Sequence, residues 1–292
     1  MTGNRLRAST ASSRRGRAPD TDGGPIDGTT VRYGIHPVME ALAAGVVIEV
    51  IATGVDRAQV ATVVRRATYL RVPVRDVPPG DVDRVTAGAR HQGVAALIRP
   101  HRYLSVDELR VRVAASAEDP MMIALDGVED PQNFGAVLRT AEGAGALAVV
   151  VGSRNASPVT AAVARASAGA VDRVPVVRVD SLPATLVALK RDGFRIVGLD
   201  GEAPISYDST ELLGRVVIVA GSEGRGLGRT VLQVCDSLVR IPLHGAVASL
   251  NVSVAVAVVA FDVRAQRRHR DAADRLASLG AEPLVAADLR GD

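Results

Sequence analysis

The stretch that decides the fold is Leu125-Asp-Gly-Val-Glu-Asp-Pro-Gln-Asn-Phe-Gly-Ala-Val-Leu-Arg-Thr140. A hydrophobic run ends at Asp126, a polar loop follows, and helical spacing begins near Asn133. Strand, loop and helix in this order are typical of open α/β sheets, which bind ligands in the crevice at the carboxyl ends of their strands. We therefore expect the loop to border a ligand site, with Asn133 capping the helix and Arg139 reaching back toward the crevice. Taken alone, the stretch also fits a capped helix that carries a surface arginine.

A second block, Val216-Val-Ile-Val-Ala-Gly-Ser-Glu-Gly-Arg-Gly-Leu227, runs from a buried strand into a loop dense in glycine. Glycine lets a backbone approach a ligand closely because it has no side chain. The block lacks the Gly-Lys-Ser/Thr of a phosphate-binding P-loop. Its spacing from Gly224 is Gly-x-Gly-x-Gly, which fails the dinucleotide pattern and disfavours a nucleotide-cofactor oxidoreductase. Glu223 in this loop fits either a ligand pocket or the cap of the next helix.

A third block is Leu238-Val-Arg-Ile-Pro-Leu-His-Gly-Ala-Val-Ala-Ser-Leu-Asn-Val-Ser253. Its strand stops at Pro242, a loop follows, and Ser249 is placed to cap a long apolar helix. Asn251 then falls in the first turn, where the asparagine side chain competes for backbone hydrogen bonds. This placement suggests that the Asn251 amide has a specific partner, although a plain helix start also accounts for the block.

From residue 121 onward strand and helix alternate almost throughout, which predicts a parallel sheet covered by helices on both faces. We expect strands at 46–53, 72–77, 94–98, 121–125, 146–151, 174–179, 194–199, 216–220 and 238–241. We expect helices at 37–43, 56–69, 81–86, 105–115, 133–144, 160–167, 182–190, 227–233 and 252–268. The predicted division is a disordered arginine-rich tail at 1–30, a small α/β domain at 31–99, a linker at 100–119, a large α/β domain at 120–268 and a charged tail at 269–292.

Composition narrows the class of protein. Hydrophobic residues make up 47% of the 292-residue chain and aromatic residues only 2%, so the core must be built from Val, Leu, Ile and Ala. This argues against an RNA reader built mainly on aromatic stacking. The basic residues are almost all arginine, whose planar side chain grips phosphate oxygens. The formal net charge of +3 is compatible with RNA binding but does not require it.

The single cysteine, Cys235, excludes a disulfide framework and any cysteine-based zinc site. No apolar run is both long enough and free enough of charge to cross a membrane, and the N-terminus lacks the apolar core of a signal peptide. We expect a cytoplasmic protein with no membrane segment and no metal ion.

Together, in this order and at this spacing, the three blocks resemble the motifs of the SpoU (TrmH-type) RNA 2′-O-ribose methyltransferases. The matches are Asn-x-Gly-x-(hydrophobic)₂-Arg from Asn133, Gly-x-Glu-Gly-x-Gly-Leu from Gly221, and Ile-Pro followed by Ser-Leu-Asn-Val-Ser from Ile241. The resemblance covers residues 120–268. Residues 33–98 resemble the family's RNA-binding domain, at Tyr33-Gly-Ile-His-Pro-Val38 and His91-Gln-Gly-Val94. These local matches indicate the RlmB-like branch, which modifies a guanosine of large-subunit rRNA.

The resemblance implies a fold that spacing alone does not show: a SPOUT-type α/β domain tied in a trefoil knot, with the last helix threaded through a loop. It also implies S-adenosylmethionine (SAM) as methyl donor, structured RNA as substrate, and an obligate homodimer whose active site takes residues from both chains. The alternatives are the same chemistry on tRNA, or on an rRNA nucleotide that confers antibiotic resistance, and an rRNA-binding assembly factor without catalysis. The N-terminal arginines are either a solvated tail or a mobile arm for RNA phosphates.

The family's functional residues carry over onto matching positions of this chain. Arg139 is expected to be the central catalytic residue, gripping a phosphate and polarising the hydroxyl, because a guanidinium holds its proton too tightly to act as a simple base. Asn133 is expected to orient Arg139 or the ribose. The other catalytic positions are Glu223, Ser249 and Asn251; the SAM-binding positions are Gly221, Ile241, Leu243, Ser249 and Leu250; the RNA-binding positions are His36, Arg90, His91, Gln92 and Arg165. His36 and His91 fit a purely structural role equally well.

Overall fold

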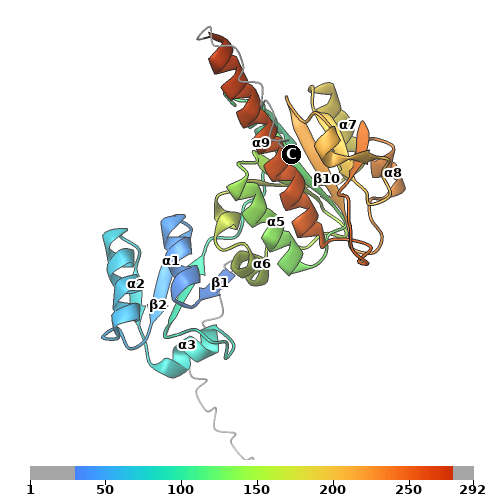
Figure 1. Cartoon of the computed structure of the whole chain (residues 1–292). Helices are drawn as coiled ribbons and strands as arrows, with labels where there is room; N and C mark the ends of the chain where they lie inside the picture. Colours follow the sequence, from blue (N-terminus) through green and yellow to red (C-terminus); the bar gives the residue numbers. More distant parts are fainter. Residues whose placement is uncertain (1–29, 279–292) are drawn as a thin grey trace, which may run out of the picture.

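The computed structural model describes residues 30–278, which form a small sheet domain followed by a larger one (Figure 1). The arginine-rich tail predicted at 1–30, apart from Thr30, lies outside the described residues, as does the charged tail beyond Ser278. No helix within the described range is long and apolar enough to cross a membrane.

The small domain is a four-stranded mixed sheet with helices on both faces. Its elements are β1 (Thr30–Tyr33), α1 (Ile35–Ala43), β2 (Val47–Ala52), α2 (Ala58–Tyr69), β3 (Val74–Asp76), α3 (Pro79–Val85) and β4 (Val94–Ile98). The strand order is β1-β4-β2-β3, with β4 antiparallel to β1 and β2 and with β2 parallel to β3. One face packs against α1 and α2 through Val38 and Val63, and the other packs against α3 through Val82.

The large domain holds a parallel sheet of seven strands. Its strands are β5 (Met121–Asp126), β6 (Ala148–Gly152), β7 (Val176–Val179), β8 (Arg195–Leu199), β9 (Ile205–Ser206), β10 (Val216–Gly221) and β11 (Ser237–Arg240), in the order β7-β6-β5-β10-β8-β11-β9. Its helices are α4 (Val106–Ala114), α5 (Pro131–Gly143), α6 (Ala161–Ala166), α7 (Leu182–Arg191), α8 (Arg229–Leu232) and α9 (Val252–Ser278). Short 3₁₀ turns lie at Ala170–Asp172 and Tyr207–Ser209.

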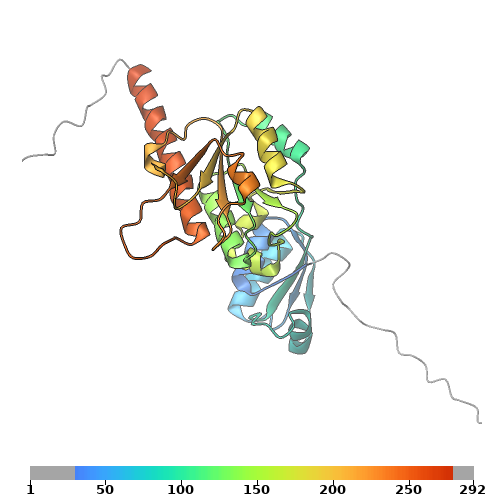
Figure 2. The same ribbon diagram turned by 90° about the vertical axis from the view of Figure 1, so that its right-hand side faces the viewer.

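Both faces of this sheet are buried, as the alternation of strand and helix predicted (Figure 2). Successive side chains of a strand point to opposite faces. On β5, Met122 and Ala124 join the core beneath α4, α7 and α8, while Ile123 and Leu125 join the core beneath α5, α6 and the start of α9. The strands can therefore be apolar along their whole length, which explains the long Val- and Ile-rich runs.

The start of α5 differs from the prediction. Asp130, not Asn133, caps the helix, because its carboxylate accepts hydrogen bonds from the backbone N–H groups of Gln132 (3.1 Å) and Asn133 (3.4 Å). Pro131 starts the helix well because it has no N–H to leave unsatisfied. The Asn133 side chain is consequently free to bond elsewhere.

The last helix also differs at both ends. Ser249 was predicted as its cap, but the helix starts at Val252 and the Asn251 Oδ1 atom accepts the Ser253 N–H (2.9 Å), so Asn251 caps it. The helix continues past the predicted end at Arg268 to Ser278, because the charged, alanine-rich continuation consists of good helix formers. Strands β1 and β9 were not predicted; both are short and lie at sheet edges.

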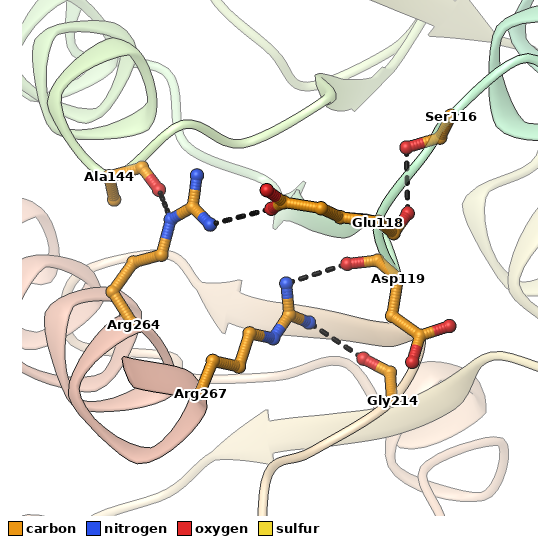
Figure 3. Close-up of polar contacts among 7 residues, drawn as sticks. All are labelled: Ser116, Glu118, Asp119, Ala144, Gly214, Arg264 and Arg267. Carbon is orange, nitrogen blue, oxygen red and sulfur yellow. Dashed lines mark hydrogen bonds and ion pairs between the residues drawn. The ribbon is translucent and has the colours of Figure 1, made fainter. Parts of the chain in front are cut away.

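Two arginines of α9 bind the helix to the segments that lie just before the parallel strands, at their amino ends (Figure 3). Arg267 is buried, and its guanidinium donates to the backbone oxygens of Asp119 and Gly214, each at 2.6 Å. Burial lowers the pKa of Arg267. Arg264 Nε donates to Ala144 O (2.6 Å). Asp119 and Gly214 precede β5 and β10, so the helix is anchored where these strands begin.

The two domains contact each other through buried charge. Arg32 of β1 and Asp172 form a bidentate ion pair, with side chains 5% and 6% exposed, across the domain boundary. Beside it, Arg165 Nη1 donates to the Tyr33 hydroxyl (2.8 Å), and the Arg165 guanidinium lies 5.3 Å from the centre of the Tyr33 ring. A desolvated ion pair is costly to break, so this contact orients the small domain against α6.

Candidate active site

A cleft of about 940 Å³ opens at the carboxyl ends of β8, β10 and β11. Its walls are the glycine-rich loop after β10, residues 199–201 after β8, and the loop that joins β11 to α9. Open α/β sheets bind their ligands at this edge. The second and third sequence blocks thus meet at one cleft, and the first ends beside it.

Three polar side chains from separate segments form a triangle at this cleft. Asn133 Nδ2 and Asn251 Nδ2 both donate to Glu223 Oε1, each at 2.9 Å, and Asn251 Nδ2 also lies 2.8 Å from Asn133 Oδ1. The specific partner predicted for the Asn251 amide is confirmed. The triangle joins α5, the glycine-rich loop and α9, and Glu223 serves it rather than capping α8, whose cap position is Gly228.

The glycine-rich loop folds back tightly on the end of its strand. A Cβ atom at Gly221 would lie 2.1 Å from the carbonyl carbon of Gly226, so no side chain fits there. Gly226 itself has a φ of +64°, a left-handed conformation that favours glycine. Asp126 Oδ2 accepts the Gly228 N–H (2.7 Å) and ties the loop to the end of β5. The loop therefore presents backbone rather than side chains to the cleft.

All the predicted SAM-binding positions line the cleft: Gly221, Ile241, Leu243, Ser249 and Leu250. The loop residues from Pro242 through Leu250 are all exposed. Leu243 and Leu250 contribute apolar wall, while Glu223 and Asp200 contribute carboxylates. The cleft therefore offers both apolar surface and negative charge to a ligand.

Arg139 is not part of this cleft within one chain. It lies on the exposed side of α5, does not line the cavity, and forms no hydrogen bond or ion pair with any residue between 30 and 278. The side chain does not reach back from α5 to the triangle as expected. The expected link between Asn133 and Arg139 is replaced by the bonds from Asn133 to Glu223 and Asn251.

The predicted RNA-binding residues divide into engaged and available side chains. His91 Nδ1 accepts the Gly93 N–H (3.0 Å), and its Nε2 lies 2.9 Å from Asp83 Oδ1. Gln92 Oε1 accepts the Ile35 N–H at the start of α1 (3.1 Å), and Arg165 is held by Tyr33. These three side chains have structural partners, although Gln92 and Arg165 are exposed, as His36 and Arg90 are.

Sequence reasoning missed two carboxylates of the site, Asp126 and Asp200. Asp126 is the last residue of β5 and Asp200 directly follows β8, and this position at the carboxyl end of a strand is the signal that could have found them. Among the described residues, no group of three or more His, Cys, Asp or Glu side chains could hold a metal ion.

Comparison with known proteins identifies the family. Residues 120–261 match the model of the SpoU rRNA Methylase family, and residues 33–104 match that of RNA 2′-O ribose methyltransferase substrate binding. The 23S rRNA (guanosine-2′-O-)-methyltransferase RlmB of Vibrio cholerae is 40% identical over 205 residues, which are 70% of this chain and 83% of that protein. The chain belongs to the SpoU rRNA methylase family. It is accordingly an RNA methyltransferase, as the three sequence blocks predicted.

Further relatives agree with this membership. A protein of Mycobacterium ulcerans described as an uncharacterized tRNA/rRNA methyltransferase is 38% identical over 250 residues, 84% of this chain and 80% of that protein. The crystal structure of the SpoU methyltransferase AviRb from Streptomyces viridochromogenes, in complex with AdoMet, superimposes with a TM-score of 0.69 at 22% identity, covering 83% of this chain and 92% of that one. The SPOUT-type α/β fold, with a parallel sheet and a separate small domain, is thereby confirmed.

Proposed function

We propose that this SpoU-family protein transfers a methyl group from SAM to the ribose 2′-oxygen of a guanosine in large-subunit rRNA. The observation that carries the proposal is the triangle of Asn133, Glu223 and Asn251 at the mouth of a backbone-lined cleft. Identity of 40% to an enzyme described as a 23S rRNA guanosine 2′-O-methyltransferase supports the choice of nucleotide. This substrate places the reaction in the cytoplasm.

The residues of the cleft fit SAM. The close return of the glycine-rich loop at Gly221 leaves backbone groups to face a polar ligand edge, and Ile241, Leu243 and Leu250 offer apolar surface to an adenine ring. Glu223 supplies negative charge for a sulfonium or an ammonium group. When bound, SAM supplies an electrophilic methyl group, and no metal ion is needed.

The protein's own residues bring the hydroxyl to the donor, and the hydroxyl proton passes to water or to a nearby basic group as the 2′-oxygen takes the methyl group. Asn133 and Asn251 hold the Glu223 carboxylate in one orientation through amide donors, which positions it at low entropic cost when substrate binds. Ser249 lines the same cleft and can hydrogen-bond the ribose or SAM. Arg139 grips the neighbouring phosphate and stabilises charge that develops on the attacking oxygen.

Arg139 performs this role in the cleft of a second copy, so the active unit is a homodimer. Two observations support this arrangement. Arg139 is exposed on α5 outside the cleft of its own chain. Apolar side chains continue from the cleft along α9 without cover: Val247 is 70% exposed, Leu250 37%, Val254 47% and Phe261 51%. An exposed apolar stripe of this kind marks a protein interface.

The first test is methyl transfer from labelled SAM to purified rRNA and tRNA, followed by mapping of the modified ribose. Label on a guanosine of large-subunit rRNA is expected. Label on tRNA, or on another rRNA nucleotide, would keep the chemistry and refute the proposed target. Failure of the protein to bind SAM would refute the proposal as a whole and would favour the alternative of an rRNA-binding assembly factor without catalysis.

A subunit-mixing experiment tests the shared site. Arg139→Ala and Glu223→Gln are each expected to lose activity. If Arg139 acts across a dimer, mixed dimers contain one intact site, and a mixture in equal amounts recovers about a quarter of wild-type activity. If Arg139 acts within its own chain, every site in the mixture carries a lesion and no activity returns. Phe261→Glu provides the control, because it should block dimer formation and recovery together.

A further inference from the structure

The outer side of α2 carries a concentration of positive charge that the active site does not use. Val60, Val63 and Ala67 turn inward to the core of the small domain. The exposed part of α2 and its two ends, named here the α2 face, carry Arg57, Arg65, Arg66, Tyr69 and Arg71, all exposed. In Figure 1, α2 lies on the outer side of the small domain, with α1 between it and the large domain.

The arginines of the α2 face outnumber the acids next to them in the sequence, Asp56 and Asp76. From Arg57 through Arg75 the sequence contains five arginines and neither aspartate nor glutamate, although the whole chain has a formal net charge of only +3. Arg75 pairs with Glu49 (3.1 Å). The four arginines of the α2 face form no ion pair with any of the residues that the structure describes. Their positive potential is therefore open to a partner.

Two local features suit this face to nucleic acid. The Arg66 guanidinium lies over the Tyr69 ring, 5.5 Å from its centre, and Tyr69 is 78% exposed, so both flat groups are available to stack on a base. Arg71 follows α2 with a φ of +57°, where the Arg71 N–H bonds to Thr68 O and the Val72 N–H to Ala67 O. Glycine usually occupies this left-handed position at a helix end. Arginine at this position is less favourable for the backbone than glycine, but it adds a positive charge to the α2 face.

We propose that the α2 face is the surface on which this protein docks structured RNA, through phosphate contacts of its arginines and stacking on Tyr69. This inference rests on the proposed function and adds the site of substrate recognition. Because α2 lies on the side of the small domain away from the large one, the RNA segment that it contacts is separate from the nucleotide that is methylated.

The test compares two charge reversals of equal size. The variant Arg65→Glu/Arg66→Glu alters the α2 face. The control Arg112→Glu/Arg191→Glu alters exposed arginines of α4 and α7 in the large domain. Binding to deproteinised total rRNA is measured at several salt concentrations, together with KM for RNA, kcat and SAM affinity.

The α2-face variant is expected to bind RNA at least about tenfold more weakly than the control and to lower the slope of log affinity against log salt by about 1 to 2. Its KM for RNA should rise, with kcat and SAM affinity unchanged. Equal RNA affinity in the two variants would show that the face is merely solvated and would overturn the inference, as would a wild-type protein that does not bind rRNA. Methyl transfer by the wild type tests the proposed function separately.

Arg71→Gly separates recognition from stability. Glycine relieves the left-handed backbone, so the thermal midpoint should be unchanged or higher, while RNA affinity should fall several-fold. Tyr69→Ala, which leaves the charge intact, should also weaken RNA binding by about fivefold or more through loss of stacking. RNA affinity at the wild-type level in both variants would contradict the docking surface.

Discussion

Asn251→Asp probes the triangle, because it keeps the helix cap and removes only the amide donor. Aspartate caps a helix as well as asparagine does, so the bond from the Ser253 N–H to position 251 is preserved. The variant loses the donor to Asn133 Oδ1 and Glu223 Oε1, two hydrogen bonds worth about 1 kcal/mol each. It also sets two carboxylates where Asn251 Nδ2 and Glu223 Oε1 now lie 2.9 Å apart.

Repulsion between two such carboxylates costs between about 1 and 4 kcal/mol, and the lower end applies because both residues are exposed. The total is about 3 kcal/mol at pH 8, or a fall of about 6 to 12 °C in Tm. The introduced carboxyl binds a proton more tightly in the folded chain than in the unfolded chain. The deficit should therefore be small near pH 4 and should grow as the pH rises to neutrality.

Thermal unfolding of Asn251→Asp and wild type across this pH range measures the deficit as a difference. A second change, Glu223→Gln, supplies a new amide donor next to the introduced carboxylate. The double variant should therefore recover at least half of the lost stability. A deficit that does not change with pH, or a double variant as unstable as the sum of the two single ones, would refute the reasoning.

Three further predictions concern packing, anchoring and reactivity. Gly135→Ala should destabilise by about 1 to 3 kcal/mol in urea unfolding, because its Cβ would lie 2.4 Å from that of Ala166, whereas Gly143→Ala on the same helix, with its nearest neighbour at 3.5 Å, should be neutral or stabilising. Arg267→Leu should lower the free energy of unfolding by about 2 to 4 kcal/mol, because it leaves two backbone oxygens unpaired. SAM affinity measured by calorimetry should stay at the wild-type value, because Arg267 binds at the amino ends of the strands and the cleft lies at their carboxyl ends. Burial raises the pKa of Cys235 to about 11. At pH 8 its alkylation by iodoacetamide should therefore be about 100-fold slower than that of a free cysteine, and the rate should increase with pH. A rate like that of a free thiol would contradict this burial.

Much of the architecture could be predicted because it follows from periodicity. Buried parallel strands need continuous apolar runs, and the strands at 94–98 and near 121–125 were recognisable on that basis. Helix caps were harder to predict, because several residues near the start of a helix can cap it. The path of the neighbouring chain decides which of them does. Asp130 in front of Pro131 displaced Asn133 as a cap, and the return of α9 to the cleft made Asn251 the cap in place of Ser249.

The site could be predicted as a set of residues but not as an arrangement. The glycine spacing indicated that the backbone around Gly221 lies very close to another group. The structure shows that this group is the returning chain at Gly226. No local pattern could show that Asn133, Glu223 and Asn251 bond to one another, since these contacts join distant parts of the chain. The position of Arg139 outside its own cleft could not be deduced either, because it depends on how α5 lies in the assembled domain.

The triangle has a consequence for the order of events during synthesis. Asn133 and Asn251 are separated by 118 positions in the chain, and Glu223 and Asn251 by 28. Contacts between such distant residues form late, after the intervening loops have closed. While α9 is still inside the ribosome, the nascent chain exposes Asn133 and Glu223 but cannot yet place Asn251 beside them. The loop before α9 cannot yet form its wall of the cleft. The triangle and the cleft therefore form only after α9 has been synthesised and has packed against α5.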